Sequence, residues 1–166
     1  MGTTESAATG TGLNVSIERM TEHDLVEVCQ IEETSELSAW GWDAYHNELQ
    51  SGDTIMLIAR IKPALNEHNV AGFIVARLIA DELHVNNVAV RIEFRERGIG
   101  SVLLQNTLTH ARQRKAKIAQ LEVRASNEAA QKLYQRCGFT ISGSRRNYYR
   151  QPLEDALLMS ASLGDC

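Results

Sequence analysis

The stretch Arg95–Leu104 reads RERGIGSVLL and places two glycines, one residue apart, between basic residues and an apolar run. The apolar positions that follow, Leu104, Leu108 and Ala111, share one helical face and predict a helix from Ile99 to about Arg114. The N–H groups at a helix start are unpaired and carry partial positive charge, and glycine lets an anion approach them closely. The pattern alone therefore indicates either a phosphate cradle or a tight turn that needs left-handed residues.

Runs rich in β-branched residues precede this stretch and predict strands. They are Val15–Ile17, Thr54–Ile61, Val70–Ile79 and Leu83–Val90. A polar turn with Pro63 and Asn66 is expected to separate the second run from the third. Residues 1–12 are small, polar and without periodicity, which indicates a flexible tail before a single domain over residues 13–166.

Two helices are predicted between the first two strands. Thr21–Asp24 resembles a capping box before apolar residues at three-residue steps, so one helix is expected to start there. Trp42, Tyr45 and Leu49 recur at the spacing of one face of a second helix.

The second half alternates strands with helices. Ile118–Arg124 predicts a strand and Asn127–Cys137 a helix that ends at Gly138, and Phe139–Ser142 and Asp155–Ser160 predict closing strands. Hairpins followed by a β-α-β-α-β run predict an α/β fold whose sheet is mostly antiparallel and contains one parallel crossover pair.

Composition narrows the class of protein. The 166 residues include 43% hydrophobic and 23% charged residues, as in an ordinary globular domain, and no apolar run approaches the ~20 residues of a membrane span. A net charge of −4 argues against a general nucleic-acid binder. The three cysteines, Cys29, Cys137 and Cys166, are odd in number and lack CxxC spacing, so we expect neither a disulfide framework nor a zinc site. This cysteine usage favours a protein of the reducing cytoplasm.

A longer motif decides between the two explanations of the glycines. The segment Leu121–Phe139, LEVRASNEAAQKLYQRCGF, together with R-x-x-G-x-G at Arg95–Gly100, resembles the GNAT family of acetyl-CoA-dependent N-acetyltransferases. The segments RRNYY (Arg145–Tyr149) and EDALLMS (Glu154–Ser160) look like its RimI-like subgroup, the ribosomal-protein alanine N-acetyltransferases. The resemblance covers roughly residues 15–160. It implies a GNAT fold, with a mixed, mostly antiparallel sheet that is splayed at its centre and flanked by helices.

The resemblance also implies acetyl-CoA as co-substrate, without a metal. The residues whose backbone would cradle its pyrophosphate are Arg95, Glu96, Arg97, Gly98, Ile99, Gly100 and Ser101. The pantetheine arm would pair like an extra strand with Val88, Ala89 and Val90. Asn127 would touch the coenzyme and also cap its helix.

Two side chains match the catalytic positions of the family. Glu122 would be the general base, although the strand pattern by itself favours an exposed or arginine-paired carboxylate, and partial burial is expected to raise its pKa. Tyr134 would be the general acid beside the coenzyme sulfur, although tyrosine on an amphipathic helix is more often a core residue. Glu82 and His84 are rival bases on the earlier strand.

Aromatic residues are the candidates for acceptor binding. Tyr148 and Tyr149 suit a loop that grips a peptide end, with packing on the sheet as the alternative. The subgroup has Pro-Trp-Ser after the first helix, whereas this chain keeps only the tryptophan, Trp40, in the sequence Ala39–Trp42.

The expected reaction is acetylation of a protein N-terminal amine, and the subgroup resemblance names the N-terminal alanine of a small-subunit ribosomal protein. A lysine or a small-molecule amine is the alternative acceptor, and a non-catalytic acyl-CoA-binding module is the alternative class. The presence of both Glu122 and Tyr134 argues against such a module, which needs neither. Direct binding to nucleic acid or membrane is not expected, and a monomer is favoured.

Overall fold

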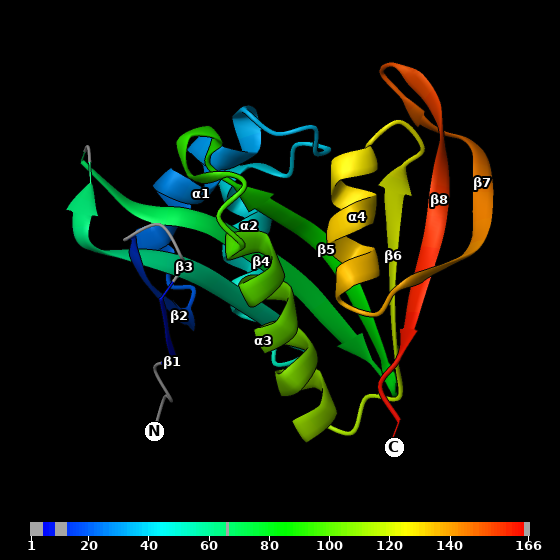
Figure 1. Ribbon diagram of the computed structural model, residues 1–166, viewed down its shortest axis with the longest axis horizontal. Coiled ribbons are helices and arrows are strands. Elements are labelled where there is room, and N and C mark those ends of the chain that lie inside the picture. Colours follow the sequence, from blue (N-terminus) through cyan, green and yellow to red (C-terminus); the bar gives the residue numbers. More distant parts are fainter. Residues whose placement is uncertain (1–4, 9–12, 66, 165–166) are drawn as a thin grey trace.

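The computed structural model describes residues 5–8, 13–65 and 67–164. Its described strands form one eight-stranded sheet in the order β1-β2-β3-β4-β5-β6-β8-β7 (Figure 1). They are β1 (Glu5–Ala8), β2 (Asn14–Arg19), β3 (Thr54–Leu65), β4 (His68–Ile79), β5 (Glu82–Val90), β6 (Ile118–Arg124), β7 (Thr140–Arg150) and β8 (Leu153–Ser162). The helices are η1 (Glu22–Asp24), α1 (Leu25–Glu33), α2 (Gly41–Leu49), η2 (Ile92–Phe94), α3 (Ile99–Gln113) and α4 (Glu128–Arg136).

One parallel pair interrupts the antiparallel sheet, as the sequence predicts. Strands β5 and β6 pair in parallel only over Glu82–His84 and Ile118–Gln120. Beyond these residues the two strands diverge, and the gap between them widens toward their carboxyl ends (Figure 1). The expected splay at the centre of the sheet is therefore present, because the parallel ladder ends after three residue pairs.

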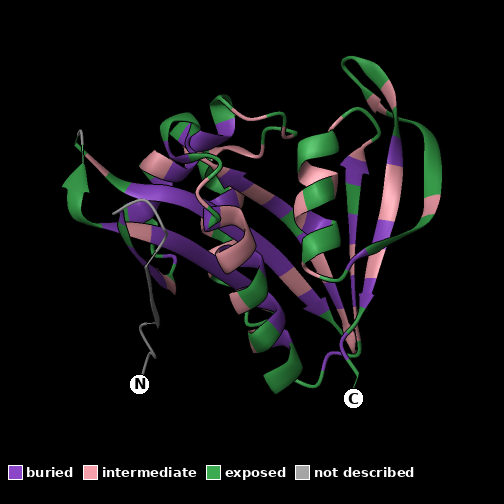
Figure 2. Cartoon of the chain, in the orientation of Figure 1, coloured by how far each residue is buried: buried purple, intermediate pink, exposed green. Residues whose placement is uncertain are grey.

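Two apolar cores identify the two faces of the sheet. One core joins Leu103 and Leu108 of α3 and Tyr134 of α4 to strand residues that include Leu121 and Val123 of β6. The other joins α1 and α2 to the opposite face of the central strands, for example through Ile31, Tyr45 and Phe73. Figure 2 shows the resulting buried band along the central strands, whereas β7 is exposed along most of its length. Helices α3 and α4 thus cover one face, and α1 and α2 the other.

Local signals in the sequence explain where three elements begin or end. The Thr21 N–H and hydroxyl both donate to Asp24 Oδ2, at 2.9 and 3.0 Å, which closes the predicted capping box ahead of α1. Asn127 Oδ1 accepts from the Ala130 N–H at 3.1 Å and so caps α4. Gly138 follows α4 with φ +95°, a conformation that glycine adopts without strain.

The structure corrects four details of the sequence prediction. Glu5–Ala8 form β1, paired antiparallel with β2, instead of belonging to a tail; the other tail residues lie outside the described part. Pro63 lies within β3, not in a turn, and Asn66 is not among the described residues. Tyr148 and Tyr149 lie in the long strand β7, not in a loop. Trp42 is 44% exposed, so it does not share the buried face of Tyr45.

Candidate active site

A cleft of ≈ 870 Å³ opens where β5 leaves β6, on the face covered by α3 and α4. Most of the residues predicted to bind the coenzyme line it: Val88, Ala89, Val90, Arg95, Glu96, Gly98, Ile99, Gly100, Ser101, Asn127 and Tyr134. Arg97 does not line the cleft, and its guanidinium carbon lies over the Phe94 ring, 5.8 Å from the centroid. The glycine stretch, the end of β5 and α4 therefore meet around one space, although they are distant in sequence.

The open edge of β5 presents its backbone to the gap at alternate residues. The Arg91 N–H donates to the carbonyl of Ala71 in β4 at 2.7 Å. Backbone polar groups alternate in direction along a strand, so those of Val88 and Val90 point away from β4, toward the gap. Ala89 turns its carbonyl toward β4, where a Cβ on Gly72 would come within 2.7 Å of it. Val88 thus presents its backbone to the gap, whereas the Val90 carbonyl already accepts a hydrogen bond from Arg95 Nε at 2.9 Å. That a pantetheine arm pairs along Val88, Ala89 and Val90 stays a prediction, and all three residues line the cleft.

The loop that follows has the backbone shape of an anion site. Glu96 and Gly98 both have positive φ, +62° and +79°, and Gly98 is the N-cap of α3. The amides of the first turn of α3 have no intrahelical acceptor and carry the positive end of the helix dipole. At Gly100 a Cβ would lie 3.3 Å from Leu133 Cδ2, so glycine here allows α3 and α4 to approach closely. Both features fit a pyrophosphate held by backbone N–H groups.

Tyr134 belongs to the core and also lines the cleft. It is 7% exposed, and its ring contacts Phe139 at a centroid separation of 6.0 Å. Burial raises the pKa of its hydroxyl, and Tyr149 and Cys137 raise it further. The hydroxyl consequently keeps its proton at neutral pH, as a proton donor requires.

Glu122 lies on the other face of the sheet. Its strand neighbours Leu121 and Val123 point into the core under α3 and α4, so Glu122 points away from them. Its side chain is 37% exposed, and its Oε1 lies 3.8 Å from Arg145 Nε. The side chain is therefore partly exposed and close to an arginine, which is the arrangement that the strand pattern by itself favoured. Glu122 does not line the cleft.

Of the aromatic residues expected to bind the acceptor, Tyr148 and Tyr149 lie together, whereas Trp40 packs beside Tyr45. Tyr149 stacks against Arg124, whose guanidinium carbon is 4.1 Å from the ring centroid. Burial raises the pKa of Tyr149 to about 12. Arg124 is two residues from Glu122 on β6 and shares its face, so the Tyr149 ring lies on the face of Glu122. Tyr148 is exposed and packs edge-on against Tyr149 at 5.1 Å. Trp40 is half-buried beside Tyr45 and lines no part of the cleft.

The rival bases, Glu82 and His84, lie next to each other where β5 and β6 are still paired. His84 Nε2 lies 3.3 Å from Glu82 Oε2, and His84 pairs across the parallel ladder with Gln120. His84 alternates with the core residues Leu83 and Val85, so it lies on the face of Glu122. It could relay a proton through water, but Glu122 is closer to the open end of the gap.

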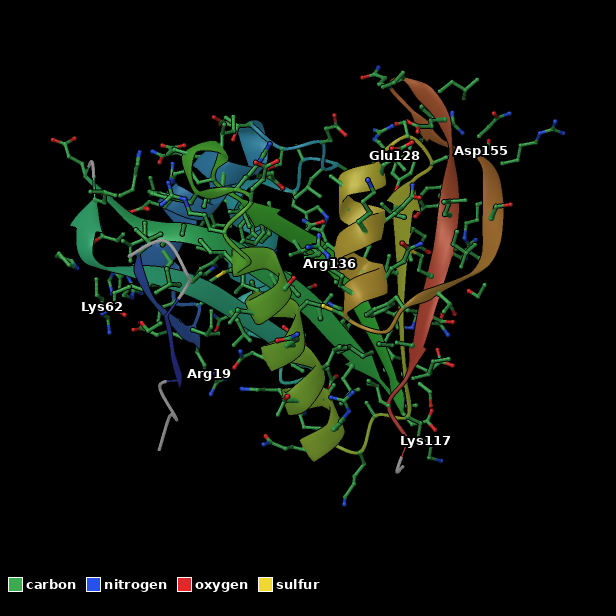
Figure 3. All side chains as sticks on the ribbon, in the orientation of Figure 1. Arg19, Lys62, Lys117, Glu128, Arg136 and Asp155 are labelled. Atoms are coloured by element: carbon green, nitrogen blue, oxygen red, sulfur yellow. The ribbon has the colours of Figure 1, made fainter. Side chains whose placement is uncertain are left out.

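Sequence reasoning missed several residues of the cleft. They are Thr34, Ser35, Glu36, Leu37, Ile92, Phe94, Ala129, Ala130, Leu133 and Arg136. Helical spacing from Asn127 could have found Ala130 and Leu133, which share its face. Arg136 lies on the side of α4 that faces α3 (Figure 3) and adds a cation to the cleft. No sequence signal places Thr34–Leu37 there, because this segment approaches the glycine stretch only through the fold.

Within the described residues, no helix is long and apolar enough to cross a membrane. Over the same part of the chain, no three His, Cys, Asp or Glu side chains are grouped as metal ligands. The described cysteines, Cys29 and Cys137, are free.

Known proteins resemble this chain in sequence and in fold. The family model described as "Acetyltransferase (GNAT) family" matches residues 22–139. The [ribosomal protein bS18]-alanine N-acetyltransferase of Haemophilus ducreyi is 30% identical over 150 residues, which cover 89% of this chain and 99% of that protein. The crystal structure of the ribosomal-protein-S18-alanine N-acetyltransferase of Escherichia coli is similar with a TM-score of 0.79 at 27% identity, over 92% of this chain and 96% of that one.

A more distant neighbour shares the fold. Arabidopsis thaliana NAA60, solved in complex with acetyl-CoA, has a TM-score of 0.80 at 18% identity, over 89% of this chain and 98% of that one. The fold of this chain is thus also found in a protein solved with acetyl-CoA bound. From the match of the family model to most of its length, the chain belongs to the GNAT family and is an acetyltransferase that uses acetyl-CoA.

Proposed function

We propose that this enzyme acetylates the α-amine of a protein N-terminus, and that its acceptor is the N-terminal alanine of a small-subunit ribosomal protein. The relatives named for ribosomal protein bS18 support the acceptor. The observation that carries the reaction is the placement of Tyr134 and Glu122 on opposite faces of the splay. Coenzyme and acceptor would therefore approach from opposite faces and meet in the gap.

The two side chains account for the protons of a direct transfer. The amine nitrogen bonds to the thioester carbonyl carbon, and the carbon–sulfur bond breaks. Tyr134, protonated because burial raises its pKa, donates a proton to the leaving thiolate. The acceptor nitrogen loses two protons: Glu122 accepts the first from the ammonium, directly or through water, and the second, lost as the nitrogen–carbon bond forms, passes through water to the Tyr134 phenolate and restores it. Val88 and Val90 and the backbone around Gly98 hold the coenzyme in place.

The pKa of the acceptor favours an α-amine over lysine. The pKa of an α-amine is near ~7.7–8.0, against ~10.4 for lysine, so roughly a tenth of an α-amine is already neutral at pH 7. A lysine acceptor would arrive almost entirely protonated, so the general base would have far more to do.

Mass spectrometry of peptides incubated with acetyl-CoA tests the proposal. The substrate is an alanine-starting peptide from a small-subunit ribosomal protein that also contains one internal lysine. A matched peptide with a blocked N-terminus is the control. We expect one acetyl group on the α-amine of the first peptide and none on the second. Acetylation of the lysine in both peptides would replace this function with lysine acetylation. Coenzyme binding without any transfer would instead indicate a binding module.

A further inference from the structure

The side chain of Arg95 donates hydrogen bonds to two backbone carbonyls. Its Nε donates to the Val90 carbonyl at 2.9 Å, and its terminal nitrogen Nη2 donates to the Thr34 carbonyl at 3.3 Å. Val90 ends the open edge of β5, and Thr34 is the C-cap of α1. Arg95 thus joins the start of the glycine loop to a segment 61 residues earlier in the chain.

The segment that Arg95 holds, Thr34–Trp40, forms a wall of the cleft through Thr34–Leu37. We refer to Thr34–Trp40 as the α1–α2 segment. Because it connects the two helices on the face of Glu122 and also reaches the cleft, it borders both sides of the splay. Its position can therefore affect the acceptor and the coenzyme together.

The other end of the α1–α2 segment is fastened by a buried carboxylate. Glu32, 4% exposed, accepts hydrogen bonds from the Trp40 and Gly41 N–H groups at 2.7 and 3.1 Å. Glu32 also accepts from the Tyr45 hydroxyl at 2.7 Å, and Asn87 of β5 donates to that hydroxyl at 2.9 Å. The Trp40 end of the segment is therefore fixed to β5 within the core. The attachment of the Thr34 end to Arg95 is exposed to solvent, so it can change more easily.

We propose that Arg95 is a positioning residue, which couples the coenzyme loop to the α1–α2 segment, and that its guanidinium is not a phosphate ligand. The backbone amides of the loop hold the pyrophosphate. When the loop is ordered by the coenzyme, the guanidinium orders the α1–α2 segment with it through the hydrogen bonds to Val90 and Thr34. A planar guanidinium can donate to Val90 and Thr34 at once, whereas a lysine ammonium on a flexible stem does not reproduce this fork. The proposal rests on the proposed function only for where the acceptor lies.

Hydrogen exchange of the α1–α2 segment, measured with and without coenzyme A, tests the coupling and needs no acceptor. The proteins are the wild type, Arg95→Lys, which keeps the charge, and Arg95→Gln, which removes it. Arg114→Lys is the matched control, because Arg114 Nη2 also donates to a distant backbone carbonyl, that of Gly52 at 2.8 Å, at the far end of α3. Calorimetric titration gives the coenzyme dissociation constant of each protein.

In the wild type and in Arg114→Lys, we expect coenzyme A to slow exchange in the α1–α2 segment. In both Arg95 variants this protection should fall by about three- to tenfold, the effect of one or two exposed hydrogen bonds. The dissociation constant should change less than the protection does, and by the same factor in both variants. Equal protection in the wild type and Arg95→Lys would overturn the proposal. So would tenfold weaker binding in Arg95→Gln that Arg95→Lys restores, because charge alone would then matter.

Failure of the coupling and failure of the proposed acceptor are separate results. The exchange experiment uses coenzyme A alone, so it gives the same answer whether the acceptor is an N-terminus or a lysine. Once the peptide assay has identified an acceptor, its KM provides a second readout. A positioning role predicts that Arg95→Lys raises the acceptor KM more than it raises the KM for acetyl-CoA.

Discussion

At the scale of single residues the mechanism depends on Glu122, which lies beside Arg145 on the acceptor face. Glu122→Gln should lower kcat/KM on an alanine-starting peptide by about 10²-fold near pH 7, the low end for general-base catalysis, since part of the α-amine is already neutral. The loss should shrink as the pH rises through the α-amine pKa near ~7.7–8.0, because more acceptor then arrives neutral. The measurement is a pH–rate profile of both proteins.

Glu128→Gln is the control for Glu122→Gln, since Glu128 is an exposed glutamate in the first turn of α4 that does not line the cleft. A deficit of Glu122→Gln that stays constant from neutral to high pH would argue for positioning of the acceptor instead of proton removal. Activity equal to the wild type would transfer the role to His84, which lies on the same face, or to water.

The sequence predicted these two residues unequally well. Tyr134 lies where the motif and the helical spacing from Asn127 place it, and its two expected roles, core and cleft, occur together. For Glu122 the alternation of β6 predicted the partly exposed face beside an arginine, whereas the family position predicts its role as the general base. Which face of the sheet meets the coenzyme depends on where α3 and α4 pack, and strand alternation alone does not contain that information.

At the scale of elements, the junction of β5 and α3 depends on Gly100. A Cβ there would lie 3.3 and 3.5 Å from the two Leu133 methyl carbons and 3.8 Å from Val90 Cγ2. Gly100→Val should therefore displace the Leu133 side chain and add bulk beside the cleft, and weaken coenzyme A binding by at least about tenfold while the fold persists. Calorimetric titration measures the affinity, and circular dichroism checks the fold.

Gly52→Val is the matched substitution for Gly100→Val, because a Cβ on Gly52 meets nothing within 4 Å and this residue does not line the cleft. Its coenzyme affinity should equal that of the wild type. If Gly100→Val also binds coenzyme A with unchanged affinity, close approach of α3 and α4 is not what the glycine provides.

Element positions were predictable where local chemistry determines them, as at Thr21, Asn127 and Gly138. They were not predictable where pairing with a neighbouring strand extends an element. Strand β7 continues to Arg150 because β8 pairs with it across a register shift between Arg145 and Tyr149, and the polar sequence RRNYY hides this. The α1–α2 segment reaches the cleft only because Glu32 and Arg95 fasten its ends, which are contacts between distant parts of the chain.

At the scale of the whole molecule, the mixed order of strands and helices was enough to predict one parallel pair in an antiparallel sheet. The splay lies at that pair, because the ladder between β5 and β6 ends after three residue pairs. The amino-terminal edge was not predictable, since Glu5–Ala8 carry little β propensity and form β1 through pairing with β2.

The stability of this amino-terminal part of the sheet should depend on acid pH through Glu18 of β2. Burial raises the pKa of Glu18, but hydrogen bonds from Lys62, Arg60 and Ser16 outweigh it and lower the pKa from 4.5 to about 2. The ionised form is thus favoured by folding, so its contribution is complete above pH 4.5 and is lost as the pH falls toward 2.

Urea denaturation of the wild type and Glu18→Gln at several pH values between 7 and 2 measures this contribution. Because the Glu18 side chain is 25% exposed and screened by solvent, we expect the substitution to lower the free energy of unfolding by about 1–2 kcal/mol at pH 7. The difference between the two proteins should have nearly disappeared at pH 2, where Glu18 is about half protonated in the folded state and almost fully protonated in the unfolded state. Glu33→Gln, an exposed glutamate of α1, should show no such trend. A difference for Glu18→Gln that is independent of pH would mean that shape and hydrogen bonding, not charge, hold β2 to β3 at this point.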